Sequence, residues 1–174
     1  MNVNAASRTN EKLYQTQQLL QLLASNNSAT RSLQNGLLSA AVFSLQGAYL
    51  AFLLEIALAH HLKLDFVESL HQLIPSLERK GITDLAAREL QQLHVDGEWP
   101  AWLLGWYRSA LGDDGWKPAS DKPPSDKSAA ANNIIGIVDV SANNSPVLTP
   151  VAILDVLEKL RLFIEEQREH LLEW

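Results

Sequence analysis

The sequence has no cysteine and is poor in positive charge, with 14 basic residues against 20 acidic ones and a formal net charge of -6. Without cysteine the chain cannot form disulfides, thiolate zinc sites or a cysteine nucleophile. Phosphate contacts need clustered lysine and arginine, so we expect no DNA partner. The opening MNVNAASRTNEKLY has no apolar run after a basic start, so we expect no secretory signal. These absences favour a cytoplasmic protein whose mature chain starts near Met1.

Signature motifs of the large enzyme classes are missing too. The chain has no GxSxG, no Walker loop, no GxGxxG and no pattern typical of a catalytic triad. We therefore expect no cofactor and favour a protein that is not an enzyme. The sequence alone does not specify what the protein does.

Apolar residues, by contrast, are plentiful and make up 47% of the 174 residues. A chain of this size and composition can bury one core without crosslinks. Its apolar spacing predicts a single all-α domain over residues 1–174. The expected fold is an irregular antiparallel bundle of five to six helices around a long apolar central helix, with a long loop at 113–148 before the last helix.

Capping residues and helix breakers place the expected helix ends. Along the last helix, apolar residues at helical spacing predict one seam against the bundle, formed by Leu157, Leu160, Ile164, Leu171 and Trp174. The expected helices run from Ser7 or Thr9 to Ala24, from Thr30 to His61, from a capping box of Asp65 and Glu68 to a stop before Pro75, from Thr83 to His94, from Pro100 to Leu111 with a stop at Gly112, and from Thr149 or Pro150 to the C-terminus.

Within the long loop, residues 134–140 read IIGIVDV, a short β-branched run with strand character. No second clear strand is present to pair with it. One interpretation is that its isoleucines cap an end of the core in extended form. The other is that its backbone pairs with another chain, as in a dimer or a partner's sheet.

The apolar run from Leu37 to Ala59 has the length and hydropathy of a borderline membrane span. Gln46 and Glu55 lie well inside it, and a central acid costs about 2.5 kcal/mol or more on insertion scales. Only Arg31 and Lys63 flank it, and no aromatic belt does. We therefore expect the buried central helix of a bundle and no membrane, while a membrane-associated helical protein stays an alternative.

One face of this helix is nearly free of bulk, because Ser44, Ala48, Ala51, Glu55 and Ala59 follow one another at helical spacing. A neighbouring helix can approach such a face closely, which would bury Glu55. A buried carboxylate must either hold a proton or meet a donor. Glu55 is thus either a polar tie that fixes helix register or a proton-handling acid in a cleft. The candidate donors are Lys12, Tyr14, Arg88 and Arg161.

Metal sites find little support in the residue spacing. Glu68 and His71 form a Glu-x-x-His pair, but a carboxylate-bridged di-iron bundle needs two such pairs and further glutamates. His60 and His61 are adjacent, so on a helix they point about a third of a turn apart and cannot chelate one ion together. We expect both to be solvated near a helix end, and we expect no metal.

Arg88 and His94 are separated by five residues, which resembles the Arg-x(4 to 6)-His pattern of the helical HEPN ribonuclease superfamily. The resemblance implies that Arg88 binds phosphate and His94 serves acid-base chemistry. The simpler interpretation pairs Arg88 with a carboxylate and leaves His94 in the last turn of its helix. A HEPN-like ribonuclease is therefore an alternative function, with Arg88, His94 and Glu55 as its candidate catalytic residues.

The helix expected from Pro100 to Leu111 is unusually aromatic. With the preceding Trp99 it presents more large rings than one face of a short helix readily buries, and exposed aromatic side chains mark contact sites. Core packing competes for at least two of them. Our leading prediction is a non-enzymatic interaction or scaffold protein with an unidentified protein partner, and a homodimer is left open. The predicted partner-binding residues are Trp99, Trp102, Trp106 and Tyr107.

Three stretches, RTNEKLY, FSLQGAYLAFLLEIA and the closing LEW, resemble an uncharacterised gammaproteobacterial family of about this length, a domain of unknown function. In relatives, histidines stand at the places of Ser44 and Leu54 and tyrosine at that of Gln46. This chain departs at all three and keeps Gly47 and Glu55. The resemblance implies a bacterial origin and a shared fold, and any chemistry that used those histidines would be absent here.

Overall fold

The computed structural model describes residues 3–26, 30–62, 66–112 and 146–172. These residues form six α-helices and no strand, which confirms the all-α prediction. The helices are α1 (Val3–Ser25), α2 (Arg31–Ala59), α3 (Leu70–Glu78), α4 (Leu85–Val95), α5 (Trp99–Leu111) and α6 (Pro150–Leu172).

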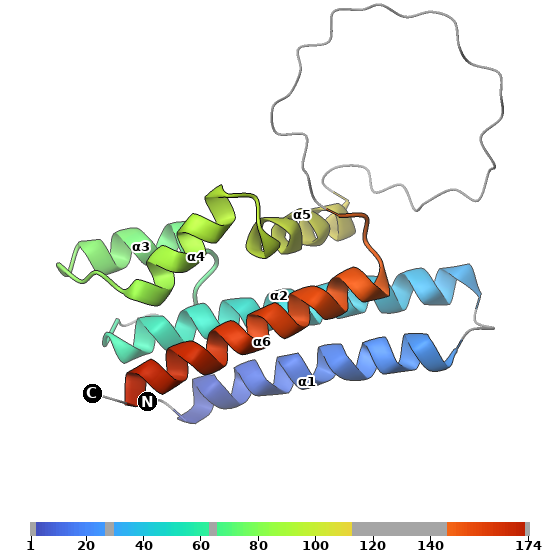
Figure 1. Cartoon of the computed structure of the whole chain (residues 1–174), viewed down its shortest axis with the longest axis horizontal. Coiled ribbons are helices and arrows are strands. Elements are labelled where there is room, and N and C mark those ends of the chain that lie inside the picture. The colour runs from blue at the N-terminus through green and yellow to red at the C-terminus, as the bar shows by residue number, and fades with distance from the viewer. Residues whose placement is uncertain (1–2, 27–29, 63–65, 113–145, 173–174) are drawn as a thin grey trace, which may run out of the picture.

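The three long helices α1, α2 and α6 lie alongside one another, and the shorter α3, α4 and α5 lie along one side of them (Figure 1). Helix α2 runs antiparallel to α1, and α6 runs in the same direction as α2. The start of α1 and the end of α6 therefore lie at one end of the bundle. This arrangement brings residues from both ends of the chain next to the C-terminal part of α2.

Helix α2 is the centre of the core, as expected, because it contacts each of the other five helices. Its small residues serve the contact with α1. Ala41 and Ala48 are fully buried, and the Ser44 hydroxyl donates a hydrogen bond across the interface to the Lys12 carbonyl at 3.1 Å. The largest fully buried side chains of the core are Phe52, Leu45, Leu53, Leu73, Leu77, Leu90, Leu103, Ile153, Leu157, Leu160, Ile164 and Val42.

In the described part of the chain, α2 is also the one helix that has the length and composition to cross a membrane. Half of its most apolar stretch is buried against the other helices. Its N-terminal part is more open, with Leu33 about half exposed. Core helices of soluble proteins and membrane spans both fit this description, so the expectation that no membrane is involved stays a prediction.

The predicted starts of the first and third helices were wrong. Helix α1 already begins at Val3, so Thr9 lies inside it and is fully buried. Helix α3 begins after Ser69, whose side chain accepts a hydrogen bond from the Gln72 N–H. The capping box expected from Glu68 therefore does not start α3, and Pro75 lies within the helix without stopping it.

Smaller shifts affect the next two helices. Asp84, not Thr83, caps α4 by accepting a hydrogen bond from the Ala87 N–H at 2.7 Å. Pro100 is the second residue of α5 and not the first. The predicted stop at Gly112 is confirmed, since its φ of 85° is a left-handed conformation that glycine adopts without strain.

The segment before α6 is described only from residue 146, so the predicted extended run at 134–140 lies outside the described residues. Pro146 returns to the bundle, where its carbonyl accepts a hydrogen bond from Trp106 Nε1 at 3.0 Å. Thr149 then caps α6, as predicted. Of the predicted seam, Leu157, Leu160 and Ile164 are buried; the side chains of 171 and 174 lie outside the described residues.

Candidate functional site

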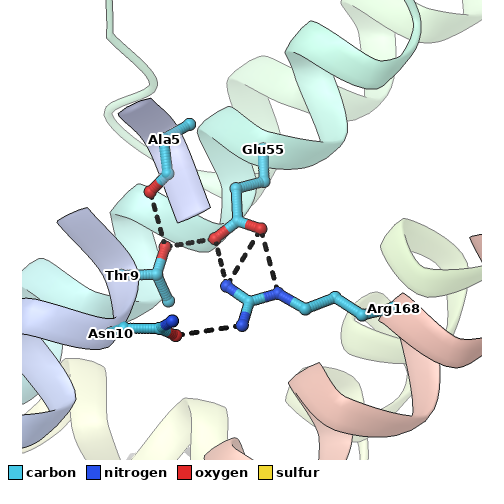
Figure 2. Close-up of polar contacts among 5 residues, drawn as sticks. All are labelled: Ala5, Thr9, Asn10, Glu55 and Arg168. Carbon is cyan, nitrogen blue, oxygen red and sulfur yellow. Dashed lines mark hydrogen bonds and ion pairs between the residues drawn. The ribbon is translucent and has the colours of Figure 1, made fainter. Parts of the chain in front are cut away.

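Two groups of polar residues are candidates for a functional site, and the first surrounds Glu55. Its carboxylate is buried and accepts hydrogen bonds from Arg168, from Nη2 at 2.8 Å and from Nε at 3.2 Å. The Thr9 hydroxyl lies between this carboxylate and the Ala5 carbonyl (Figure 2). Arg168 also donates to Asn10 Oδ1 at 2.9 Å. Side chains from α1, α2 and α6 thus meet in one network at the end of the bundle.

None of the predicted partners of Glu55 reaches it. Lys12 bonds Gln15, Arg161 bonds Gln17, and Arg88 pairs with Glu78, while the partner found is Arg168. Arg168 was missed because it lies 113 positions away on a helix that the sequence does not place relative to α2. With its oxygens occupied, Glu55 fits the polar tie between helices.

The second candidate is a pocket of about 420 Å³ where α2, α3, α4 and α5 meet. Its volume falls within the range of small-molecule sites, roughly 300 to 1,000 Å³. The wall combines apolar and polar side chains, and every one of the four helices or its N-terminal flank contributes. We call this the α2–α5 pocket; it is lined by Gln46, Tyr49, Leu50, Glu68, Ser69, Leu70, His71, His94, Pro100, Leu104 and Arg108.

Helix α2 contributes two polar groups to the wall of the α2–α5 pocket. Gln46 and Tyr49 are 5% and 8% exposed, and neither side chain has a hydrogen-bond partner in the described ranges. The Tyr49 ring packs edge-on against Trp99, with centroids 6.1 Å apart. Burial raises the pKa of the Tyr49 phenol, so its hydroxyl keeps its proton and stays a donor.

Two histidines lie side by side on the wall of the pocket. The rings of His71 on α3 and His94 on α4 meet edge to face, with centroids 6.0 Å apart. Burial lowers the pKa of His94, and the nearby His71 and Arg108 lower it further. His94 is therefore neutral at pH 7 and offers one donor and one acceptor nitrogen.

Charge enters from the rim. Arg108 on α5 is exposed and lines the pocket, and no ion pair or hydrogen bond holds its guanidinium within the part of the chain that is described. Glu68, which lies just before α3, also lines the pocket. The first two N–H groups of α3, from Leu70 and His71, have no backbone acceptor among the described residues. Donors therefore outnumber acceptors around the pocket.

The Arg88 and His94 pair predicted from the ribonuclease pattern is split by the helix. Six positions apart, the two side chains point about a third of a turn away from each other. Arg88 pairs with Glu78 at 2.8 Å on the surface. His94 lines the pocket instead, and the arginine whose charge lowers the pKa of His94 there is Arg108.

The aromatic side chains of α5 are less exposed than their number suggested. Trp99 and Trp106 belong to the core, and Trp102 and Tyr107 are half-buried against it. Lys159 lies over the Trp102 ring, 5.1 Å from its centroid, and Tyr107 packs edge-on against Phe43. The prediction that these four residues bind a partner stays a prediction, and its premise of exposed rings does not hold.

Of the two histidines at the end of α2, His61 is exposed as expected and His60 differs. His60 is not simply solvated, because its Nε2 lies 2.7 Å from Asp84 Oδ2, and this contact links α2 to the capping residue of α4. Glu68 and His71 both line the pocket. The described residues contain no group of three or more His, Cys, Asp or Glu side chains that could hold a metal ion.

Of the residues that line the pocket, the sequence indicated His94 as a candidate site residue and offered Glu68 and His71 only as a metal pair that was not expected, while Gln46, Tyr49 and Arg108 were not predicted. Gln46 did carry a signal, since it is a polar residue inside the most apolar helix of the chain. Arg108 carried none, because arginine near the end of a helix is expected on general grounds.

Comparison with known proteins gave one result for the whole chain. The model of a family described as a family of unknown function, DUF6586, matches residues 1–174. No curated protein and no solved structure matched.

Proposed function

We propose that this chain, which belongs to DUF6586, a family of unknown function, is a binding protein for a small molecule. The small molecule occupies the α2–α5 pocket. The observation that carries this proposal is a pocket of small-molecule size with two polar side chains of α2 on its wall. Gln46 and Tyr49 are 5% and 8% exposed, lie on adjacent turns of one helix and have no hydrogen-bond partner among the described residues. Their polar atoms are accessible through the pocket, because the buried side-chain atom without a partner in the described part of the chain is Trp102 Nε1.

Polar groups that face a pocket without a partner in the protein are typical of sites at which a ligand completes the hydrogen bonds. The other walls fit this role. Leu50, Pro100 and Leu104 provide apolar surface beside the polar groups, and mixed walls of this kind bind a small molecule by burial while a few polar groups fix its orientation.

The proposal is tested by screening fragment-sized acids, amides and amines by saturation-transfer NMR. We expect hits with the wild type that disappear in Leu104→Trp, whose larger side chain fills the pocket from a half-buried position. Leu162→Trp is the matched control, because Leu162 is 58% exposed on α6 and does not line the pocket. The absence of hits, or hits that survive equally in Leu104→Trp, would contradict the proposal.

The localisation, the origin and the protein partners of the chain are proposed from other observations. The absence of cysteine supports a cytoplasmic protein. The net negative charge supports one that does not bind DNA. The resemblance at RTNEKLY and FSLQGAYLAFLLEIA supports a gammaproteobacterial origin. A protein partner or a homodimer would use exposed apolar side chains such as Leu33 and Tyr14 better than the rings of α5.

The ribonuclease alternative has one observation in its favour, which is that His94 and Arg108 line one pocket. Incubating the wild type and the double variant Arg88→Ala, His94→Ala with structured and unstructured RNA tests it. Cleavage by the wild type that is lost in the variant would support a ribonuclease, and equal inertness would remove it.

A further inference from the structure

Resting on the proposed function, we infer that the ligand of the α2–α5 pocket carries an oxyanion, a carboxylate or a phosphate, on a small apolar body. The first argument is the balance of hydrogen-bonding groups. Arg108 offers only donors, because a guanidinium has no acceptor, and the Tyr49 hydroxyl, which burial keeps protonated, can donate one hydrogen bond as well as accept. Gln46 adds an amide that has no partner within the described residues. A ligand that accepts several hydrogen bonds satisfies this wall.

The second argument is charge. The groups that face the pocket and can carry charge are Arg108 from α5, His94 from α4, His71 from α3, Tyr49 from α2 and Glu68 before α3. Arg108 and Glu68 are both exposed at the rim, where water screens their opposite charges, and His71 is exposed as well. His94 is half-buried, and Arg108 lies close enough to lower the pKa of His94. A negative charge bound beside Arg108 and His94 is therefore favoured by both groups.

The third argument is the start of α3. This helix has nine residues, and its Leu70 and His71 N–H groups have no backbone acceptor within the described ranges, since Ser69 caps the N–H of Gln72 instead. Free N–H groups at a helix start favour an anion. The buried amide of Gln46, on the wall of the same pocket, is the independent sign that a polar group is bound there.

Binding of an anion should change the protonation of His94, which binding of a neutral molecule should not. Burial, His71 and Arg108 lower the pKa of His94 in the free protein. A bound negative charge favours the imidazolium, so the pKa of His94 rises when the ligand enters. We expect a proton to be taken up on binding, and affinity to increase as the pH is lowered from 8 to 6. The other titratable or charged groups that line the pocket are His71, Glu68, Arg108 and Tyr49, and burial keeps the Tyr49 phenol neutral over this range.

The experiment compares three probes that share one ring: benzoate, phenyl phosphate and benzamide. Isothermal titration at pH 6.5 and low ionic strength measures each dissociation constant. We expect at least one of the two anions to bind tenfold or more tightly than the neutral amide. Whichever anion binds more tightly identifies the chemistry as carboxylate or phosphate.

Variants assign the binding to named groups. Arg108→Gln should weaken the anions about tenfold and leave benzamide unchanged, while the control Arg88→Gln, outside the pocket, should change neither. Tyr49→Phe and Gln46→Leu should weaken anion binding without lowering the melting temperature, because each removes a polar group that has no hydrogen-bond partner among the described residues. A structural role would lower the melting temperature and leave binding alone.

Two outcomes overturn the inference. If benzamide binds as tightly as the anions, and Leu104→Trp weakens the binding of all three probes equally, the small-molecule function stands and the anion inference is wrong. If none of the three probes binds, the anion inference is also wrong, and the function is then judged by the fragment screen alone.

Discussion

The carboxylate of Glu55 lies against the guanidinium of Arg168, 113 positions later in the sequence, with Nη2 to Oε1 at 2.8 Å. The side chains of Glu55 and Arg168 are 5% and 21% exposed, so the pair is largely withdrawn from water. Thr9 completes the contact from α1. This network joins the three long helices at the end of the bundle where α1 begins and α6 ends.

Arg168→Met tests the tie. Removing one partner of a buried ion pair leaves an uncompensated charge, and we expect a loss of about 3–5 kcal/mol in the free energy of unfolding. Urea denaturation followed by circular dichroism measures it. Arg88→Met is the matched control, because its pair with Glu78 is half exposed and should contribute less than about 1 kcal/mol. The double variant Glu55→Met, Arg168→Met should recover part of the loss; a purely additive loss would contradict an ion pair.

The packing of α1 on α2 predicts that substitutions at the adjacent residues Gly47 and Ala48 change the stability of the fold in opposite directions. A Cβ added to Gly47 would meet the Lys12 side chain at 3.4 Å, an ordinary contact, so Gly47→Ala should stabilise the fold by about 0.5–1 kcal/mol through helix propensity. Ala48 is fully buried, so Ala48→Leu should destabilise it by about 1–3 kcal/mol through overpacking. Thermal unfolding of both variants checks this, and a destabilised Gly47→Ala would show that the helices lie closer than described.

The two tryptophans in the middle of α5 differ in their indole N–H. Trp106 Nε1 donates to the Pro146 carbonyl, whereas Trp102 Nε1 is buried without a partner in the described part of the chain. Trp106→Phe should therefore cost about 1–2 kcal/mol, and Trp102→Phe less than about 1 kcal/mol. Chemical denaturation distinguishes them. A larger loss from Trp102→Phe would mean that its indole nitrogen has a partner.

The lowered pKa of His94 predicts how stability depends on pH. Below about pH 6.5, the unfolded chain binds a proton at this residue that the folded protein still rejects, so the fold loses stability as the pH falls from 7 toward the lowered pKa of His94. His94→Gln removes this penalty. We expect the variant to gain stability relative to the wild type between pH 7.5 and 5.5, measured by unfolding at each pH. A difference independent of pH would show that the pKa of His94 is not lowered.

The sequence predicted the helices well because their signals are local. Apolar spacing, the Gly112 stop and the Thr149 cap each depend on a few neighbouring residues, and each is found in the structure. Where two adjacent residues could cap, as with Thr83 and Asp84, local chemistry does not choose between them. Thr9 was taken for a cap because threonine suits that position, whereas its hydroxyl serves Glu55 instead.

The α2–α5 pocket was harder to predict, because it depends on how four helices are placed in space. Gln46 and Arg108 lie 62 positions apart, and nothing in either neighbourhood brings them together. The pairing of His94 with Arg88 was suggested by spacing alone. Helical geometry separates that pair and places His94 beside His71, from a different helix.

The most direct test of the account is a crystal of the full chain soaked in 4-bromobenzoate, with anomalous diffraction recorded at the bromine edge. The account predicts an anomalous peak inside the α2–α5 pocket near Leu104, with the carboxylate of the probe toward Arg108 and the start of α3. A peak elsewhere on the protein and an empty pocket at saturating probe would contradict it.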